Sequence, residues 1–202
     1  TWAPGDASQE ALFEVQRISE LPELTPLLDR IHEWDMSVFD FWEASQSHGL
    51  VVGAYALLSE YQLITKFKLS KPRLLMFLNK IQSGYRMANP YHNTLHALDV
   101  LLNTNYFLRQ EKIKRLMSPL DHLACLLGAT IHDFQHPGIN NNFLAATRHE
   151  LAITYNDQSI LESHHVAATW QLLLTEECNF LTRLSKEQFN ELRSVMVQIV
   201  LG

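Results

Sequence analysis

Apolar residues recur at spacings of three and four along most of the chain, which is the spacing of one face of an α-helix. No stretch alternates apolar and polar residues between hairpin turn signals, and only seven glycines and seven prolines interrupt the sequence. The pattern therefore predicts an all-α, multi-helical fold. Helices are expected at residues 9–18, 70–81, 118–132, 157–174 and 185–201, with a further helix start at 25–26.

Residues with capping side chains mark where several of these helices begin. The expected N-caps are Thr25, Ser70, Ser118 and Ser185. Ser185 also stands three residues before Gln188, which is the pattern of a capping box. The last helix is expected to bury Phe189, Leu192, Met196, Ile199 and Val200. On the helix predicted at 157–174, the side chains expected in the core are Leu161, Trp170 and Leu174.

The composition fits one compact domain. With 202 residues, 47% of them hydrophobic, the chain is long enough for one sizeable core and short for two. We expect residues 1–30 to form a lead-in segment and residues 31–202 to form the domain. The formal net charge of -6 gives no general attraction to nucleic acid, so any binding of phosphate must be local.

The sequence carries no signal for export, membrane insertion or an oligomeric state. No apolar run reaches about 18 residues, and the opening TWAPGDA lacks the basic and apolar regions of a signal peptide. Cys125 and Cys178 lie within apolar helical patterns, so we expect two buried free thiols rather than a disulfide. These features favour a cytoplasmic location.

Histidine is concentrated in one part of the sequence, where eight of the ten histidines fall between residues 92 and 165. Imidazole is the commonest metal ligand and also titrates near neutral pH, so such a cluster is expected where a metal site and acid–base chemistry share a pocket. His132 and Asp133 end an otherwise apolar helix, where a buried carboxylate needs a charged partner. A divalent ion fits this need, and the two carboxylate oxygens can bridge two ions that together activate water for phosphodiester hydrolysis.

A single histidine on an apolar helix face is usually a hydrogen-bonded core residue, so His122 and His149 are expected to be structural or exposed. Adjacent residues on a helix point about 100° apart. Only one of His164 and His165 is therefore expected to share the side of Glu162.

Four segments resemble the class I 3',5'-cyclic nucleotide phosphodiesterase family, in the family's order and at comparable spacing. They are NPYHNTLHALDV at 89–100, IHDFQHPG at 131–138, ELAITYND at 150–157 and LESHH at 161–165. The resemblance covers residues 30–202, and the branches that act on cAMP look most similar. It implies an all-α, HD-type catalytic domain that hydrolyses cAMP or cGMP to 5'-nucleoside monophosphates in signal termination.

The family pattern implies a role for each matching residue. His96, His132 and Asp133 would bind the first of two divalent ions, zinc in the family, and Asp133 would bridge to the second, magnesium or manganese. His92 would be the general acid that protonates the departing O3'. The residues expected in the inner pocket or near the phosphate are Tyr91, Asn93, His136, Glu162 and His165.

The chain departs from the family pattern at two places. Gln135 stands where many members have Asp, and it is expected to point away from the ligands. The family's fourth zinc ligand, an Asp, and the residues that clamp the purine lie beyond the position that matches Gly202, so the C-terminal third of the catalytic domain is expected to be absent. Residues 1–202 alone are therefore expected to hold zinc weakly and to show little turnover.

Two other functions are compatible with these residues. A catalytically weak or inactive module could bind cyclic nucleotide, or regulate a partner, without cleaving it, although such a module has no need of His92 as a leaving-group acid. A different metal-dependent phosphohydrolase could share the His132–Asp133 pair, but relatives of that kind lack the segment from Tyr91 to His96.

Overall fold

A computed structural model describes residues 5–202, with side chains from residue 10 onward, so the first four residues of the predicted lead-in segment lie outside the described part. Every regular element within residues 5–202 is a helix, which confirms the all-α prediction. The helices are α1 (Gly5–Ser19), α2 (Thr25–Asp29), α3 (Val38–Ala44), α4 (Gly49–Glu60), α5 (Leu63–Lys66), α6 (Lys71–Gly84), α7 (Thr94–Leu108), α8 (Glu111–Lys114), α9 (Pro119–Ile131), α10 (Asn141–Ala146), α11 (Glu150–Thr154), α12 (Ile160–Leu173) and α13 (Lys186–Leu201).

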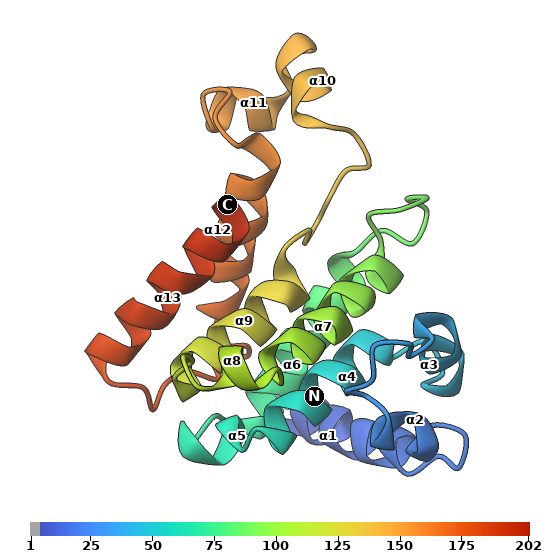
Figure 1. The fold of residues 1–202 in the computed structure, drawn as a ribbon. Helices are drawn as coiled ribbons and strands as arrows, with labels where there is room; N and C mark the ends of the chain where they lie inside the picture. The colour runs from blue at the N-terminus through green and yellow to red at the C-terminus, as the bar shows by residue number, and fades with distance from the viewer. Residues whose placement is uncertain (1–4) are drawn as a thin grey trace.

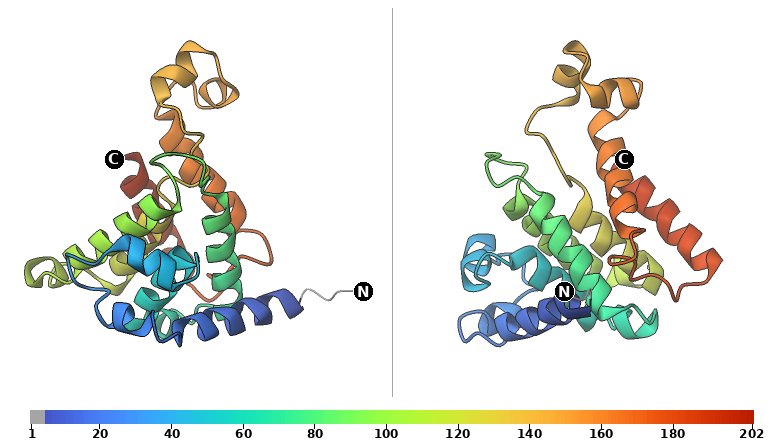
Figure 2. Two further views of the ribbon diagram at one scale, coloured as in Figure 1. Left: turned by 90° about the vertical axis from the view of Figure 1, so that its right-hand side faces the viewer. Right: turned by 180° about the vertical axis from the view of Figure 1, so that it is seen from behind.

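A bundle of the longer helices forms the body of the molecule (Figure 1). Within it, α7 packs against both α4 and α9, α9 packs against α13, and α1 lies along α6. The short helices α10 and α11 stand together at one end, apart from the bundle, and an extended segment leads to them from the end of α9 (Figures 1 and 2). From there α12 runs back to the body and packs against α13.

Two groups of buried apolar side chains hold this arrangement. The larger group runs through the bundle and includes Val15 and Ile18 of α1, which belong to the predicted lead-in segment. The domain boundary expected at residue 30 stays a prediction. The smaller group lies at α10, α11 and the start of α12 and consists of Leu144, Ala152, Ile160 and Leu161. Gly128 lets α9 and α13 approach closely, because a Cβ at this position would lie 2.9 Å from Cγ2 of Ile199.

Capping boxes begin both α9 and α13: the box at Ser185 is predicted from the sequence, whereas at Ser118 the sequence predicts the N-cap and the structure adds the box. Ser118 Oγ accepts from the N–H of Asp121, and the Asp121 carboxylate accepts in turn from the N–H of Ser118. Ser185 and Gln188 make the same pair of bonds at α13. Each box satisfies backbone N–H groups that have no partner inside the helix, so both helices begin where the local sequence places them.

The prediction of Thr25 as an N-cap is wrong. Helix α2 does begin at Thr25, but its N-cap is Leu24, which has nearly helical backbone angles of φ −89° and ψ −32°. Thr25 therefore lies inside a helical turn, and its hydroxyl donates to the Leu21 carbonyl at 3.1 Å instead of capping the helix.

Helix α12 differs from its prediction at both ends. It begins at Ile160 and not near 157, because Asn156, Asp157 and Ser159 have positive φ and form a left-handed turn that cannot continue into a helix. Leu174, expected in the core, follows the last helical residue and is 55% exposed. Trp170 and Leu161 are buried as expected.

Helix α13 buries most of the predicted face. Leu192, Met196 and Val200 are buried and Phe189 is half-buried. Ile199 is 40% exposed, contrary to the prediction, because it lies at the edge of the contact where its side chain covers Gly128. The helical period therefore predicted the position of the buried face correctly, but it predicted too wide a face.

Two further expectations concern the cysteines and the membrane. In the described part of the chain both cysteines are free thiols, as predicted, with Cys178 buried and Cys125 half-buried. None of the helices in residues 5–202 has the length and apolarity needed to cross a membrane.

Candidate metal centre

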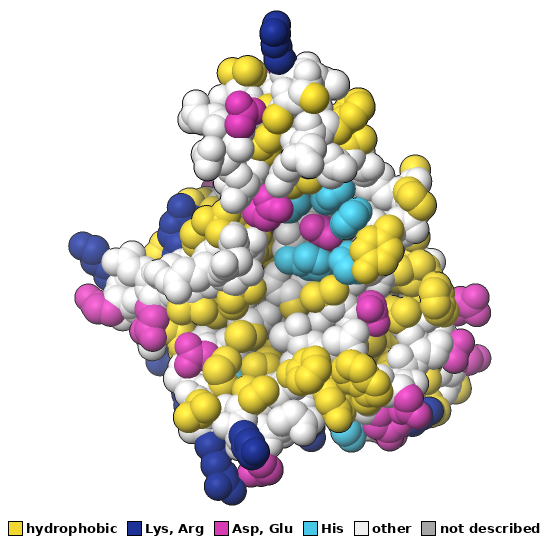
Figure 3. All heavy atoms as spheres, turned by 45° about the horizontal axis from the view of Figure 1, so that its top comes forward, with side chains coloured by type: hydrophobic (Ala, Val, Ile, Leu, Met, Phe, Trp, Pro, Cys, Tyr) yellow, Lys and Arg dark blue, Asp and Glu magenta, His cyan; other side chains and the backbone are white. Residues whose placement is uncertain are grey.

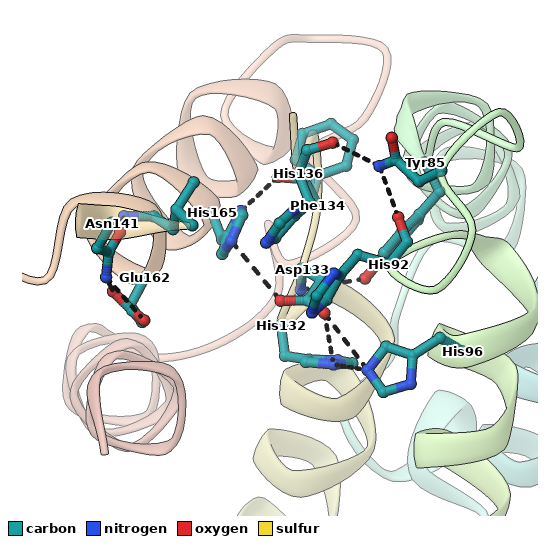
Figure 4. Close-up of polar contacts among 12 residues, drawn as sticks. Tyr85, His92, His96, His132, Asp133, Phe134, His136, Asn141, Glu162 and His165 are labelled. Atoms are coloured by element: carbon teal, nitrogen blue, oxygen red, sulfur yellow. Dashed lines mark hydrogen bonds and ion pairs between the residues drawn. The ribbon is translucent and has the colours of Figure 1, made fainter. Parts of the chain in front are cut away.

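Three helices and the loops beside them bring the clustered histidines together (Figure 4). His96 lies in the first turn of α7, His132 and Asp133 follow the last residue of α9, and His165 lies on α12. Their rings and the carboxylate point toward one another. The space-filling view shows histidine side chains gathered around an acidic one in a hollow of one face (Figure 3).

The end of α9 fixes the ring of His132. Its Nδ1 donates to the Ala129 carbonyl at 2.9 Å, and because a carbonyl only accepts, Nε2 of the neutral ring carries a lone pair. This Nε2 lies 3.1 Å from Nε2 of His96 and 3.3 Å from Oδ2 of Asp133. Nε2 of His96 lies 3.4 Å from the same Oδ2. Three possible ligand atoms thus converge on one point.

Asp133 also faces a second pair of histidines. Its Oδ1 lies 3.7 Å from Nε2 of His165, whose Nδ1 donates to the Phe134 carbonyl at 2.7 Å. His136 completes a second group with Asp133 and His165, in which one ligand atom from each residue lies within 4.8 Å of the others. The Asp133 carboxylate therefore belongs to two neighbouring groups of possible ligands.

The electrostatic environment keeps most of these groups ready to bind a cation. Burial would raise the pKa of Asp133, but the hydrogen bond and charge of His132, with smaller effects of His165 and His136, lower it to about 2. Burial lowers the pKa of His165 to about 4, and burial with the neighbouring His132 lowers the pKa of His96. Burial is the largest single influence on His132 and would lower its pKa, but the hydrogen bond and charge of Asp133 together with the bond to Ala129 outweigh it and raise the pKa. An ionised carboxylate thus faces largely neutral imidazoles, as metal binding requires.

The donor set fits a divalent cation. If one of the two rings were protonated, its N–H could bond to only one of the other two atoms. A cation attracts both nitrogens and the carboxylate oxygen at once. Neutral imidazole and carboxylate are ligands that suit zinc and similar ions. The membership of Asp133 in both groups fits a carboxylate shared by two ions.

His92 precedes α7 and is not part of the helix. Asn93 is the N-cap of α7 and Thr94 its first residue, so the helix begins too late for His92 and His96 to share a helical face. The His92 ring stacks on that of His136, with centroids 3.9 Å apart, and lies edge-on to the His96 ring at 5.8 Å. His92 is therefore beside the donor set without belonging to it.

The neighbours of His92 have different surroundings. Tyr91 is 62% exposed, and its ring centroid lies 4.5 Å from that of His96. Asn93 is buried, and its Oδ1 accepts from the N–H groups of Leu95 and His96 at 3.0 and 3.3 Å, which caps α7. These bonds give Asn93 a structural role, while its place near a phosphate stays a prediction.

One asparagine ties together the two loops that carry histidines. Nδ2 of Asn89 donates to the carbonyls of both His92 and His136, at 2.9 and 3.0 Å. Gly138 follows His136 with φ +86°, and a Cβ there would lie 2.7 Å from Oδ1 of Asn89. Glycine is therefore required for the loop to pass this close to Asn89.

A cleft of about 530 Å³ opens beside these loops, and its lining includes His92, His136 and Glu162. Nδ2 of Asn141 donates to both carboxylate oxygens of Glu162, at 3.0 and 3.3 Å. Oδ1 of Asn141 accepts from the N–H of Leu161 at 2.9 Å, which joins the first residue of α10 to the first turn of α12. The orientation of the Glu162 carboxylate is thus fixed at the cleft.

His122 and His149 are structural or exposed, as predicted, and lie outside the cluster. His122 is buried on α9, and its Nδ1 donates to the Ser118 carbonyl at 2.9 Å. His149 is the exposed N-cap of α11, where its Nδ1 accepts from the N–H of Leu151 at 3.1 Å. Both have structural roles.

The adjacent histidines of α12 face different ways, which also agrees with the prediction. His165 is buried against Asp133, whereas Nε2 of His164 lies 3.0 Å from Oε1 of Gln135 near the surface. Gln135 is exposed, and its Oε1 contacts His164 rather than the possible ligand atoms, as expected.

Three residues that position the site were not predicted as site residues: Tyr85, Asn89 and Asn141. Asn89 opens the segment 89–100, so its place in a matching motif was a usable signal. Asn141 stands directly before the NFL of 142–144 and gave a weaker one. Tyr85, whose hydroxyl bonds to the backbone at the end of α9, lies outside every matching segment.

Known proteins with similar sequences point to one family. The family model for 3'5'-cyclic nucleotide phosphodiesterase matches residues 91–202. A Drosophila melanogaster protein, dual specificity calcium/calmodulin-dependent 3',5'-cyclic nucleotide phosphodiesterase 1, is 39% identical over 182 residues, which cover 90% of this chain and 22% of that protein. The Mus musculus high affinity cAMP-specific and IBMX-insensitive 3',5'-cyclic phosphodiesterase 8A is 35% identical over 182 residues, with 90% of this chain and 22% of that protein covered.

A solved structure gives the same indication for the fold. The phosphodiesterase domain of the RhoPDE fusion protein from the choanoflagellate Salpingoeca rosetta superposes with a TM-score of 0.78 at 29% sequence identity. The match covers 93% of this chain and 55% of that chain.

The two curated relatives differ in the substrate specificity that their names state, one being dual and the other for cAMP.

Proposed function

Since the chain belongs to the 3'5'-cyclic nucleotide phosphodiesterase family, we propose that the protein hydrolyses cAMP, cGMP or both to nucleoside 5'-monophosphates and so ends a cyclic nucleotide signal. The observation that carries this proposal is the convergence of His96 Nε2, His132 Nε2 and Asp133 Oδ2 within 3.4 Å of one another. The chain spans 22% of the length of each of the two curated relatives, so the proposal concerns the whole protein.

The residues that would hold the ions follow from the two ligand groups. His96, His132 and Asp133 would bind the first ion, which we propose is zinc, and the shared Asp133 would also serve a second, magnesium or manganese. When bound, such a pair of ions supplies positive charge that activates water and polarises the phosphate. With Nδ1 bonded to the Phe134 carbonyl, Nε2 of the neutral His165 ring carries a lone pair and would face the second ion together with Oδ1 of Asp133, which lies 3.7 Å away.

His92 is proposed as the general acid. In the reaction the oxygen of water forms a bond to phosphorus, the bond between phosphorus and O3' breaks, and O3' takes up a proton to become the 3'-hydroxyl. His92 lines the cleft, lies outside the ligand group, and stacks on His136, so its ring is free to deliver that proton. The clamp made by Asn89 holds the backbone of both histidines.

The remaining predicted residues have supporting roles in this proposal. Glu162, held by Asn141, and His136 are polar groups of the cleft and would orient water there. His165 would line the phosphate side next to Asp133, and Tyr91 with Asn93 would form the adjoining wall beside His96. A module that only binds cyclic nucleotide would need neither the cleft position of His92 nor a carboxylate shared between two ligand groups.

The identity of the product tests this proposal. Labelled cAMP and cGMP are incubated with the full-length gene product, and the products are separated by chromatography. The expected product is the 5'-monophosphate, because O3' is the leaving oxygen. Release of the 3'-monophosphate, or cleavage of the glycosidic bond, would contradict it.

A further inference from the structure

The backbone at the end of α9 has an irregular hydrogen-bonding pattern directly at the ligand residues. The Ala129 carbonyl, which a continuing helix would offer to the N–H of Asp133, accepts instead from Nδ1 of His132. The N–H of Phe134 turns back to the Ile131 carbonyl at 3.0 Å. The helix therefore ends at the residue where the ligands begin, and the N–H of Asp133 is left without a helical partner.

Tyr85 supplies that partner from another helix. It is the C-cap of α6, only 3% exposed, and its hydroxyl donates to the Thr130 carbonyl at 3.0 Å. The same oxygen accepts from the N–H of Asp133 at 3.3 Å. Within residues 5–202 this hydroxyl is the one hydrogen-bond acceptor of the Asp133 N–H. Figure 4 shows Tyr85 reaching toward the backbone of Asp133.

The fit around Tyr85 is close as well as polar. A Cβ on the preceding residue, Gly84, would lie 2.1 Å from Cε2 of Phe134, so the end of α6 and the segment after α9 pack directly against each other. Phe134 is buried, and its carbonyl accepts from His165. Side chains from two other helices therefore bond to the backbone around Asp133: Tyr85 of α6 to the peptide group before it, and His165 of α12 to the peptide group after Phe134.

We infer that Tyr85 is a positioning residue of the metal centre, whose hydroxyl joins the last turn of α9 to the Asp133 backbone and so sets the direction of the shared carboxylate. This inference rests on the proposed metal centre. A buried phenol usually needs some partner for its hydroxyl. Here the partners are the Thr130 carbonyl and the N–H of Asp133. Removing a group that orients metal ligands typically changes metal affinity by about 10–100-fold.

The test compares two Tyr→Phe variants in the full-length gene product. Tyr85→Phe removes the hydroxyl at the centre, and Tyr61→Phe removes the hydroxyl that donates to Asn105 at 3.0 Å, away from the ligand groups. Metal-free protein is titrated with Co²⁺, whose visible absorption reports the arrangement of its ligands. Both variants are measured with and without sucrose, which favours the folded state, and folding is followed by circular dichroism.

The expected result is that Tyr85→Phe weakens Co²⁺ binding about tenfold and changes its absorption band, while Tyr61→Phe binds Co²⁺ like the parent. Equal affinity and equal spectra in both variants would overturn the inference. Failure of Tyr85→Phe to fold even in sucrose would also overturn it, since Tyr85 would then be a core residue. An unsubstituted protein that binds no Co²⁺ would instead refute the metal centre itself, which separates the two failures.

Discussion

Nε2 of His132 lies 3.1 Å from Nε2 of His96, although the two residues are 36 positions apart in the sequence. The backbone enforces this approach at both sites, since His132 is held by the Ala129 carbonyl and the first turn of α7 is capped by Asn93. Two imidazole nitrogens and a carboxylate oxygen brought this close gain most from a shared cation. This relationship is the basis of the predictions on metal binding.

Removal of His132 should abolish metal binding, and removal of another histidine on the same helix should not. His132→Ala deletes a ligand atom and is expected to weaken Zn²⁺ binding by more than about 100-fold, beyond the effect of losing a supporting group. His122→Ala is the control, because His122 is also on α9 and also bonds to a backbone carbonyl. Zinc content after dialysis and a competition titration measure the difference. Equal retention by both variants would place the metal elsewhere.

The role of His92 can be separated from metal binding by the choice of substrate. His92→Ala is expected to slow cAMP hydrolysis by about 10²–10⁴-fold, because O3' then leaves without a proton. Bis(4-nitrophenyl) phosphate has a leaving group that needs no acid, so its hydrolysis should fall by less than about tenfold. His164→Ala, near the surface, serves as the control and should keep both rates. Equal losses on both substrates would show that His92 is not the acid.

The clamp made by Asn89 should stabilise both the fold and the site. Asn89→Ala leaves the carbonyls of His92 and His136 without this donor and is expected to cost about 1–3 kcal/mol of unfolding free energy. The rate of hydrolysis should fall with it, since both histidines lose their backbone support. Asn103→Ala, which removes a bond to Asp99 one turn away on α7, is the control. Urea unfolding and the hydrolysis rate are the two measurements, and parental values of both in Asn89→Ala would exclude the clamp.

Stability should decrease at alkaline pH. Burial raises the pKa of Tyr55, Tyr61 and Tyr85 above 10.0, the ordinary value of tyrosine. Above that pH the unfolded chain releases phenolic protons that the native chain retains, so the free energy of unfolding falls as pH rises toward the native pKa. Tyr61→Phe should make this fall less steep. Tyr91→Phe, at an exposed tyrosine, is the control, and an unchanged slope in Tyr61→Phe would contradict the prediction.

Features that depend only on neighbouring residues, such as helix starts, were predicted most reliably from the sequence. The capping boxes at Ser118 and Ser185 are local, so the starts of α9 and α13 could be predicted correctly. Thr25 failed as a cap because the backbone before it was already helical, and Leu174 failed as a core residue because α12 ends before it. In both cases the deciding factor was the path of the chain outside the motif.

The same distinction applies to the candidate site. His96, His132 and Asp133 could be named from their motifs, and the structure brings their possible ligand atoms together. Tyr85 could not, because its role depends on a contact with Thr130 across 45 positions of sequence. Residues that bind are marked by their chemistry, whereas residues that orient them are recognisable only from the tertiary contacts they make.

The most direct test of the account is the rate of cAMP hydrolysis by the full-length, metal-loaded gene product beside its Asp133→Asn variant and a chelator-treated sample. The rate is expected to fall by at least about 10³-fold in the variant and after chelation. Added Zn²⁺ and Mg²⁺ should restore the chelated parent and leave the variant inactive. Hydrolysis at the parental rate in Asp133→Asn, or no hydrolysis by the loaded parent, would contradict the account, and the second result would favour a module that binds cyclic nucleotide without cleaving it.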